Sequence, residues 1–331
     1  MRKSRANQTV LVTGANSGVG FEAAAQLAEA GWGTVVLACR TEAKAEAARE
    51  QLVARVGKNV FVTLAIDTSE VASANAAADE LEARGTFIDG LVLNAGASGA
   101  KPHYNHDGVE VTWASTLVGH HVLTMRLWAA GLLGDGARII IAGSEGARGN
   151  LPGSKLLDIE GIAEAQFGGD MAAAIVALSK TAVQSEFANM REYVTAKLVV
   201  AWWAGALARH LPAGMTVNAV SPGSAPSSNF GRSAGGSMRL MMGALKLIGP
   251  WIGMAASLED AARRYVDALE FGPDETGLFF ATAHPKRVAG PMGRQDSPAF
   301  FASRKGQEAA FEALVRLTRI GAPKAVADAA Q

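Results

Sequence analysis

Residues 13–20 read Thr13-Gly14-Ala15-Asn16-Ser17-Gly18-Val19-Gly20, between a β-strand pattern at 9–13 and an alanine-rich helical run at 21–30. Glycines at such a turn let backbone N–H groups approach a pyrophosphate, and the following helix N-terminus carries partial positive charge. The last two glycines and Ala23 match the G-x-G-x-x-A spacing of dinucleotide-binding turns. The stretch therefore predicts a nucleotide-binding strand–turn–helix unit; a glycine-rich turn without a ligand is the alternative.

The same alternation of strand and helix continues downstream. Short runs of Val, Ile, Leu and Ala, bounded by Gly, Asn or Ser, recur between helical segments such as 42–56. Runs without polar alternation are typical of strands that helices cover on both faces. We expect strands at 9–13, 34–38, 60–66, 88–93, 138–142 and 216–220. This order predicts an α/β fold, a doubly wound parallel sheet of the Rossmann type.

Three regions depart from this rhythm, within a chain that we interpret as one domain over residues 1–331. Residues 145–190 form an insertion, which we expect to help enclose the substrate, a disordered segment being the alternative. Within it we expect a loop and then a helix at about 171–190. Residues 226–256 form a second irregular region, which we interpret as a substrate lid; its Met-rich part, 238–242, fits either a wall for a bulky apolar ligand or an ordinary packed helix. A C-terminal helical extension follows at 257–331, with helices at 258–269 and 300–320 and a short strand at 277–281.

The composition excludes several classes of protein. The chain has 331 residues, and 31 basic side chains balance 31 acidic ones, so nothing favours nucleic acid or an acidic lipid surface as partner. Cys39 is the only cysteine, which rules out an intrachain disulfide and a cysteine-based metal site. The apolar stretches at 198–208 and 244–256 are shorter than the roughly 20 residues of a membrane span. We expect a cytoplasmic protein with no metal and no membrane span.

Further motifs follow the glycine-rich turn in a fixed order. Together with Thr13-Gly14-x-x-x-Gly18-x-Gly20, this order resembles the short-chain dehydrogenase/reductase family over about residues 8–228. Residues 36–40 and 107–120 look like its retinol dehydrogenase and protochlorophyllide reductase branch. The motifs are Asp67, Asn94-Ala95-Gly96, Ser144, Tyr193-x-x-x-Lys197 and Ser221-Pro222-Gly223.

The residues after the second predicted strand indicate the cofactor. A carboxylate there would bind the ribose 2′-OH of NAD, but the chain has Cys39 and then the cation Arg40. A guanidinium offers bidentate donors to phosphate oxygens, so this pattern favours the 2′-phosphate of NADP, unless Arg40 is an ordinary solvated cation. The resemblance implies that Asp67 binds the adenine amino group; by itself Asp67 could equally cap the helix near Ser69.

The remaining cofactor contacts are implied by the resemblance. Residues 94–96 would lie along the cofactor ribose, or simply turn the chain, and Pro222-Gly223 with Ser227 would hold the nicotinamide carboxamide. The full set of expected NADP-binding residues is Gly14, Asn16, Ser17, Gly18, Val19, Gly20, Arg40, Asp67, Asn94, Ala95, Gly96, Tyr193, Lys197, Pro222, Gly223 and Ser227.

Tyr193 and Lys197 are four residues apart and therefore share one face of a helix. A phenol ordinarily titrates near ~10, and a neighbouring ammonium together with the positively charged nicotinamide would favour the phenolate. The resemblance implies that Tyr193 protonates the substrate oxygen during reduction. It also implies that Lys197 lowers the pKa of Tyr193 and binds the ribose, and that Ser144 hydrogen-bonds the substrate oxygen.

Two features differ from the family pattern. Where this branch usually has Asn, in a pattern like N-H-L-G-H, residues 116–120 read Thr-Leu-Val-Gly-His. That Asn helps to link the lysine to a water chain, so the relay here depends on whether the Thr116 hydroxyl, a donor and an acceptor, holds a water. Tyr193 also follows Ser144 by 49 positions, far more than in most members.

The leading interpretation is an enzyme that transfers a hydride between NADPH and a carbonyl or alcohol, or a conjugated double bond, of a bulky hydrophobic small molecule. It would act as a monomer or a homo-oligomer. A non-catalytic regulatory protein that binds a nucleotide and keeps the fold is the alternative. Sugar-nucleotide chemistry on an extended fold is disfavoured by the G-x-x-x-G-x-G spacing.

Overall fold

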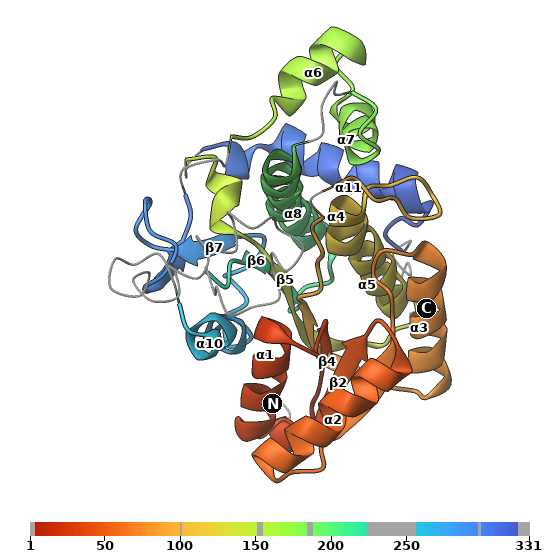
Figure 1. Ribbon diagram of the computed structural model, residues 1–331, viewed down its shortest axis with the longest axis vertical. Helices are drawn as coiled ribbons and strands as arrows, with labels where there is room; N and C mark the ends of the chain where they lie inside the picture. Colours follow the sequence, from red (N-terminus) through yellow and green to blue (C-terminus); the bar gives the residue numbers. More distant parts are fainter. Residues whose placement is uncertain are drawn as a thin grey trace, which may run out of the picture.

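The structure is a computed structural model that describes residues 4–99, 101–150, 155–183, 188–223, 256–296 and 299–323. Its strands form one sheet of eight, in the order β3-β2-β1-β4-β5-β6-β7-β8, with neighbours parallel from β3 to β7 and β8 antiparallel to β7 (Figure 1). The strands are β1 (Thr9–Thr13), β2 (Thr34–Cys39), β3 (Phe61–Ala65), β4 (Ile88–Leu93), β5 (Leu133–Ala142), β6 (Thr216–Val220), β7 (Phe279–Thr282) and β8 (Met292–Arg294).

The helices lie on both faces of this sheet. They are α1 (Gly18–Glu29), α2 (Glu42–Val56), α3 (Val71–Ala83), α4 (Val111–Trp113), α5 (Gly119–Ala129), α6 (Ile159–Gln166), α7 (Met171–Ser179), α8 (Asn189–His210), α10 (Leu258–Ala268) and α11 (Arg304–Thr318). Short helical turns occur at η1 (Arg5–Asn7), η3 (Glu145–Arg148) and η4 (Ala299–Ala302), and a π-helical turn, η2, spans Ala114–Val118. The expected doubly wound α/β fold is confirmed.

Each buried strand divides its side chains between two cores. Val10 and Val12 pack with α1, α2 and α10, whereas Leu11 between them packs with α3, α5 and α8. Successive side chains of a strand point to opposite faces, so a strand covered on both sides must be apolar throughout. This requirement explains why the strands were readable as unbroken apolar runs.

The order of the strands reverses next to the glycine-rich turn. From β1 the sheet grows through β2 to β3, and the chain then returns to β4 on the other side of β1. Open α/β sheets bind ligands at the carboxyl ends of the strands where the order reverses in this way. Here that point lies between β1 and β4, which pair through Val10–Gly90 and Val12–Val92.

Helix α2 shows the local signals that the sequence carries. The Thr41 hydroxyl accepts from the Lys44 amide at 3.3 Å and caps the N-terminus, and Gly57 takes the left-handed conformation, φ 72°, at the C-terminus. Both ends of this helix were predicted correctly. Strand β8 was not predicted, because its three residues are half-buried or exposed and carry no apolar run.

The prediction of one helix over about 171–190 is wrong, because the structure describes two helices there. Helix α7 ends at Ser179, and α8 begins at Asn189. Thr181 takes a left-handed φ of 52°, and the amides of Thr181 and Ala182 bond back to the carbonyls of Leu178 and Ala177, both at 2.9 Å. This is a Schellman motif. Its left-handed residue is usually glycine, so a threonine at this position does not predict the end of a helix.

The described parts of the insertion also contain a helix that the sequence did not indicate. Helix α6 packs against α7, and α7 packs against α11. Ion pairs join these elements at Lys305–Glu160, 2.8 Å between Nζ and Oε1, and at Arg316–Asp170, 2.7 Å between Nη1 and Oδ2. The C-terminal region contributes β7 and β8 to the sheet as well as α10 and α11. The expected lid at 226–256, except for residue 256, lies outside the described residues.

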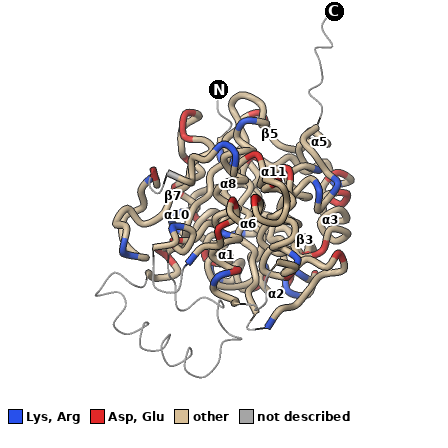
Figure 2. The backbone as a smooth tube through the Cα atoms, turned by 90° about the horizontal axis from the view of Figure 1, so that it is seen from above, with Lys and Arg blue, Asp and Glu red and all other residues tan. Residues whose placement is uncertain are grey.

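The charged residues are interspersed over the outside of the molecule (Figure 2). Basic and acidic side chains alternate along the peripheral helices, often as pairs such as Arg316 with Glu312. In the part of the chain that the structure describes, no helix is long and apolar enough to cross a membrane.

Candidate active site

The glycine-rich turn follows β1 and requires glycine at three positions, two by their backbone conformation and one by close contacts. Gly14 and Gly18 take left-handed φ angles of 68° and 58°. A Cβ on Gly20 would lie 2.5 Å from the Gly14 carbonyl oxygen and 2.4 Å from Nδ2 of Asn94. That amide donates a hydrogen bond of 2.9 Å to the Thr13 carbonyl, so Asn94 from the end of β4 holds the turn against α1.

The N-terminus of α1 fits a bound anion. Ser17 occupies the capping position but makes no side-chain cap, so the first amides of α1 have no side-chain acceptor. Six other α-helices of the described residues are capped by a side chain, those of Thr41, Glu110, Asp158, Asp170, Ser257 and Ser303. An uncapped helix N-terminus behind a tight glycine turn is the arrangement that binds pyrophosphate in dinucleotide sites.

A buried histidine supports the same turn. His120 is 1% exposed, and burial lowers its pKa to about 3, so the ring is neutral. Nδ1 lies 3.0 Å from the Thr116 carbonyl, which can only accept, so Nδ1 carries the proton and Nε2 accepts from the Thr13 hydroxyl at 2.9 Å. The same hydroxyl accepts from the Ala95 amide at 2.9 Å. His120 therefore helps to position residues 94–96. Its neutral ring does not suit the role of proton donor to a substrate, because its only N–H group is bonded to the Thr116 carbonyl.

Arg40 and Asp67 meet at the carboxyl edge of the sheet. Arg40 Nε lies 3.2 Å from Asp67 Oδ2, and both side chains are partly exposed. Asp67 Oδ1 accepts from the amide and the hydroxyl of Ser69, at 3.0 and 2.6 Å, so it caps the turn that leads to α3. Cys39 is buried, and burial raises the pKa of its thiol to about 11.

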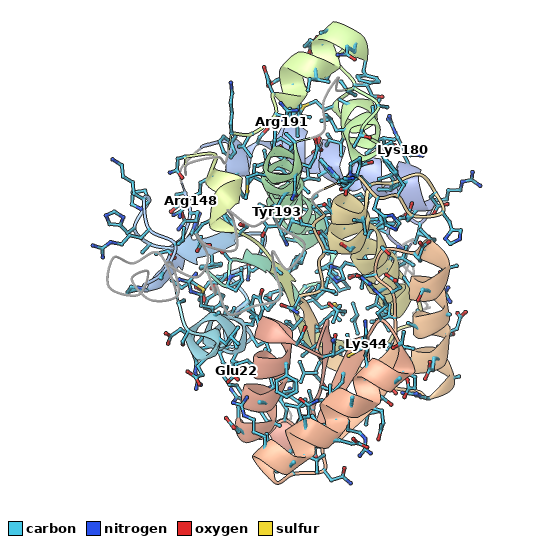
Figure 3. The ribbon with its side chains drawn as sticks, in the orientation of Figure 1. Glu22, Lys44, Arg148, Lys180, Arg191 and Tyr193 are labelled. Carbon is cyan, nitrogen blue, oxygen red and sulfur yellow. The ribbon has the colours of Figure 1, made fainter. Side chains whose placement is uncertain are left out.

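Ser144, Tyr193 and Lys197 come together beyond the carboxyl end of β5. Ser144 follows β5 and accepts from the Gly146 amide at 3.2 Å, and its hydroxyl hydrogen-bonds the Tyr193 side chain. Tyr193 lies on α8, which packs beside η3, the turn that ends at Arg148 (Figure 3). Lys197 Nζ lies 5.8 Å from the centre of the Tyr193 ring. The three residues expected to be catalytic are therefore neighbours.

Burial determines the protonation of this group. It raises the pKa of Tyr193 to about 12, against the opposing effect of the Ser144 hydrogen bond. It lowers the pKa of Lys197 to about 7. The lowering of the phenol by the ammonium, which we expected, is not a cause of the shift here, because desolvation of the phenolate dominates. The phenol is protonated at neutral pH, as a proton donor must be.

The residues around Thr116 adopt an unusual conformation. Thr116 is 2% exposed and lies within the π-helical turn. A Cβ placed on Gly96 would be 3.4 Å from the Thr116 hydroxyl oxygen. π-helical turns occur frequently at functional sites. The structure therefore brings Thr116 next to residues 94–96.

The structure also shows polar residues that the sequence analysis missed. Glu145, directly after Ser144, is 3% exposed and pairs with the buried Arg264 of α10 at 3.0 Å. An acidic residue between Ser144 and Gly146 was a visible but weak signal, and nothing in the sequence pointed to Arg264. Ser221 is buried and is followed by Pro222 and by Gly223, which takes φ 82°. Ser227 lies outside the described residues. Within those residues, no cluster of three or more His, Cys, Asp or Glu side chains could hold a metal ion.

The comparisons with known proteins agree with this geometry. The family model described as short chain dehydrogenase matches residues 8–155. The WW domain-containing oxidoreductase of Drosophila melanogaster is 31% identical over 230 residues, which are 68% of this chain and 51% of that protein. The chloroplastic protochlorophyllide reductase of Chlamydomonas reinhardtii is 35% identical over 120 residues, 35% of this chain and 30% of that protein. The chain thus spans about half of the length of the first relative and a smaller part of the second.

Two solved structures show the same fold. An uncharacterised protein from Mycobacterium paratuberculosis has a TM-score of 0.69 at 21% identity, with 97% of each chain covered. A short chain dehydrogenase from Burkholderia cenocepacia in complex with NADP has a TM-score of 0.58 at 23% identity, with 87% of this chain and 98% of that chain covered.

The fold, the order of the motifs and these matches define the class as that of nucleotide-binding α/β proteins with a Ser-Tyr-Lys group. The chain belongs to the short-chain dehydrogenase/reductase family and resembles its retinol dehydrogenase and protochlorophyllide reductase-like branch.

Proposed function

We propose that the protein is an NADP-dependent oxidoreductase that transfers a hydride between NADPH and a carbonyl or alcohol, or a conjugated double bond, of a bulky hydrophobic small molecule. The observation that carries this proposal is the convergence of Ser144, Tyr193 and Lys197 beyond β5. When bound, the reduced nicotinamide supplies the hydride. The protein's own side chains supply orientation and the proton.

Tyr193 is the proton donor in the direction of reduction. Its phenol is protonated at neutral pH because burial raises the pKa to about 12, and Ser144 holds its hydroxyl from the β5 side. With substrate bound, the Ser144 hydroxyl would donate its one proton to the substrate oxygen in place of Tyr193, which fixes the reacting carbonyl at the phenol. Lys197 would bind the ribose and restore the proton of Tyr193 through water that Thr116 holds.

The cofactor would lie at the carboxyl ends of β1 and β4, where the strand order reverses. The turn from Gly14 to Gly20 and the uncapped N-terminus of α1 suit the pyrophosphate, residues 94–96 the ribose, and Pro222-Gly223 the nicotinamide. Arg40 suits the 2′-phosphate because it stands where an NAD-binding carboxylate would, and it leaves Asp67 when the phosphate binds.

An apolar substrate is supported by the surface one turn before Tyr193. Met190 is three positions before Tyr193 on α8, so the two share a helix face, and its side chain is 45% exposed. A methionine side chain is flexible and polarisable, so Met190 would adapt to an apolar substrate bound there. The cytoplasm remains the expected location, and a homo-oligomer stays possible under this proposal.

A screen of ketones, aldehydes and alcohols with NADPH and NADH, followed by the change in cofactor absorbance, tests the proposal. We expect turnover with bulky apolar carbonyl compounds and NADPH. Tight NADPH binding without turnover on any of them would favour the second candidate, a non-catalytic nucleotide-binding protein. Thr116, in place of the relay asparagine, is the observation that keeps this candidate open.

A further inference from the structure

Glu145 and Arg264 form a buried ion pair behind the candidate active site. Glu145 Oε1 lies 3.0 Å from Arg264 Nη1, and the side chains are 5% and 7% exposed. The two residues are 119 positions apart, on η3 and on α10. The pair therefore joins two segments that the sequence does not connect locally.

The Glu145 carboxylate also accepts hydrogen bonds from the end of β7 and from the residue that follows β6. Oε1 accepts from the Thr282 amide at 3.1 Å and from its hydroxyl at 3.0 Å, and Oε2 accepts from the Ser221 hydroxyl. Glu145 thus contacts the end of β7 and the segment that follows β6. All these contacts fix the position of η3, which begins directly after Ser144.

The guanidinium completes the same frame. Arg264 Nη1 donates to the Ser221 carbonyl at 2.9 Å, and Nη2 donates to the Thr282 hydroxyl at 2.8 Å and to the Gly290 carbonyl at 2.9 Å. A Cβ on Gly223 would be 3.4 Å from Nη1 and 2.7 Å from the Val288 carbonyl oxygen. Arg264 therefore also packs against the turn Ser221-Pro222-Gly223.

These contacts place the pair between the two halves of the proposed reaction centre. On one side Glu145 directly follows Ser144 in the chain, and the Ser144 side chain hydrogen-bonds Tyr193. On the other side the Gly223 amide donates to the Ser221 hydroxyl at 3.2 Å, and that hydroxyl donates to Glu145. One carboxylate thus joins the serine loop to the turn assigned to the nicotinamide.

Stability alone does not account for such a pair. Burying two charges costs about as much as their attraction returns, and apolar side chains of similar volume often stabilise a core as well or better. What an ion pair with six further hydrogen bonds around it provides is a fixed geometry. The negative charge of Glu145 also opposes ionisation of Tyr193 and so contributes to the raised pKa of the phenol.

We propose that Glu145 and Arg264 are positioning residues that hold the turn Ser221-Pro222-Gly223 at a fixed distance from Ser144, so that the nicotinamide half of NADPH is bound next to Tyr193. This inference rests on the proposed function, since that function places the nicotinamide at this turn. It assigns a role to two residues that contact neither the reacting atoms nor the adenine half.

The test compares two ligands by calorimetric titration, NADPH and adenosine 2′,5′-bisphosphate, which occupies the adenine half alone. Glu145→Gln keeps the shape of the side chain and removes its charge. We expect its Kd for NADPH to rise about tenfold, because a charged hydrogen-bond acceptor is lost, while its Kd for the bisphosphate stays within about twofold. Glu22→Gln is the matched control, because Glu22 pairs with Arg55 at 2.6 Å on the α1–α2 side; its NADPH affinity should not change selectively.

A double variant, Glu145→Met with Arg264→Met, guards against unfolding by a single unpaired charge, and the same selective loss is expected. Native affinity for both ligands in both variants, or an equal loss for both ligands, would overturn the inference. If the unmodified protein bound neither ligand, the proposed function itself would fail. The two failures are therefore distinguishable without any turnover measurement.

Discussion

Lys197 donates a hydrogen bond of 2.7 Å from Nζ to the carbonyl oxygen of Ala142, the last residue of β5. The lysine is 5% exposed, and burial lowers its pKa to about 7 from an ordinary 10.5. The carbonyl holds the amine at the end of β5, 5.8 Å from the centre of the Tyr193 ring. This placement suits catalysis and works against stability, because an amine that is buried away from water is costly to charge.

Lys197→Met should therefore stabilise the protein at pH 7, by about 1–3 kcal/mol, while it abolishes activity. The native pKa is lower than that of the unfolded chain, so between pH 7 and 10.5 the unfolded state binds more protons and stability of the unmodified protein rises with pH. The advantage of the methionine should shrink across that range. Urea unfolding at pH 7 and pH 9.5 measures both effects.

Lys44→Met, at an exposed position of α2, is the control and should change stability little at either pH. An advantage of Lys197→Met that is absent at pH 7, or that grows toward pH 9.5, would show that Lys197 is not held by a low-polarity environment.

Arg40→Ala should remove the preference for NADPH over NADH. The 2′-phosphate loses its guanidinium partner, and the cost of a lost charge-assisted contact is about tenfold or more in Kd. Arg40→Asp should reverse the order. Arg49→Ala, at another arginine that pairs with an acidic side chain, Glu46, is the control and should leave both affinities unchanged. Equal affinity of the unmodified protein for both cofactors would contradict the assignment of Arg40.

Thr116→Val tests the proton relay. The change keeps the volume and removes the buried hydroxyl, so we expect kcat to fall on the order of tenfold while NADPH affinity is retained. Thr112→Val is a matched control in the same region, because Thr112 is also a fully buried threonine, on the neighbouring helix α4. An equal kcat in both variants would exclude Thr116 from the relay.

The sequence predicted the central fold because the physical demands on it are local. A strand covered on both faces must be apolar at every position, and the glycines of the turn are required by their φ angles and close contacts. The ordered motifs then placed Ser144, Tyr193 and Lys197. Boundaries such as those of α2 followed from a capping threonine and a terminal glycine.

The features that escaped prediction depend on contacts between distant segments. The end of α7 uses Thr181 in a conformation that its residue type disfavours. The Glu145–Arg264 pair and the Arg40–Asp67 pair join residues from segments that are distant in the sequence, and the hydrophobic periodicity does not indicate such contacts. The direction of the Tyr193 pKa shift depends on burial, which the spacing of Tyr193 and Lys197 does not reveal.

The most direct test of the catalytic assignment is turnover by Tyr193→Phe on a substrate that the unmodified protein reduces, measured beside NADPH affinity. The change removes one oxygen and keeps the ring in α8. Loss of a positioned general acid should lower kcat by about 10²–10⁴-fold while the Kd for NADPH stays within a few-fold. Tyr104→Phe, at a tyrosine that is 42% exposed, should keep native turnover. Near-native turnover by Tyr193→Phe would contradict the account.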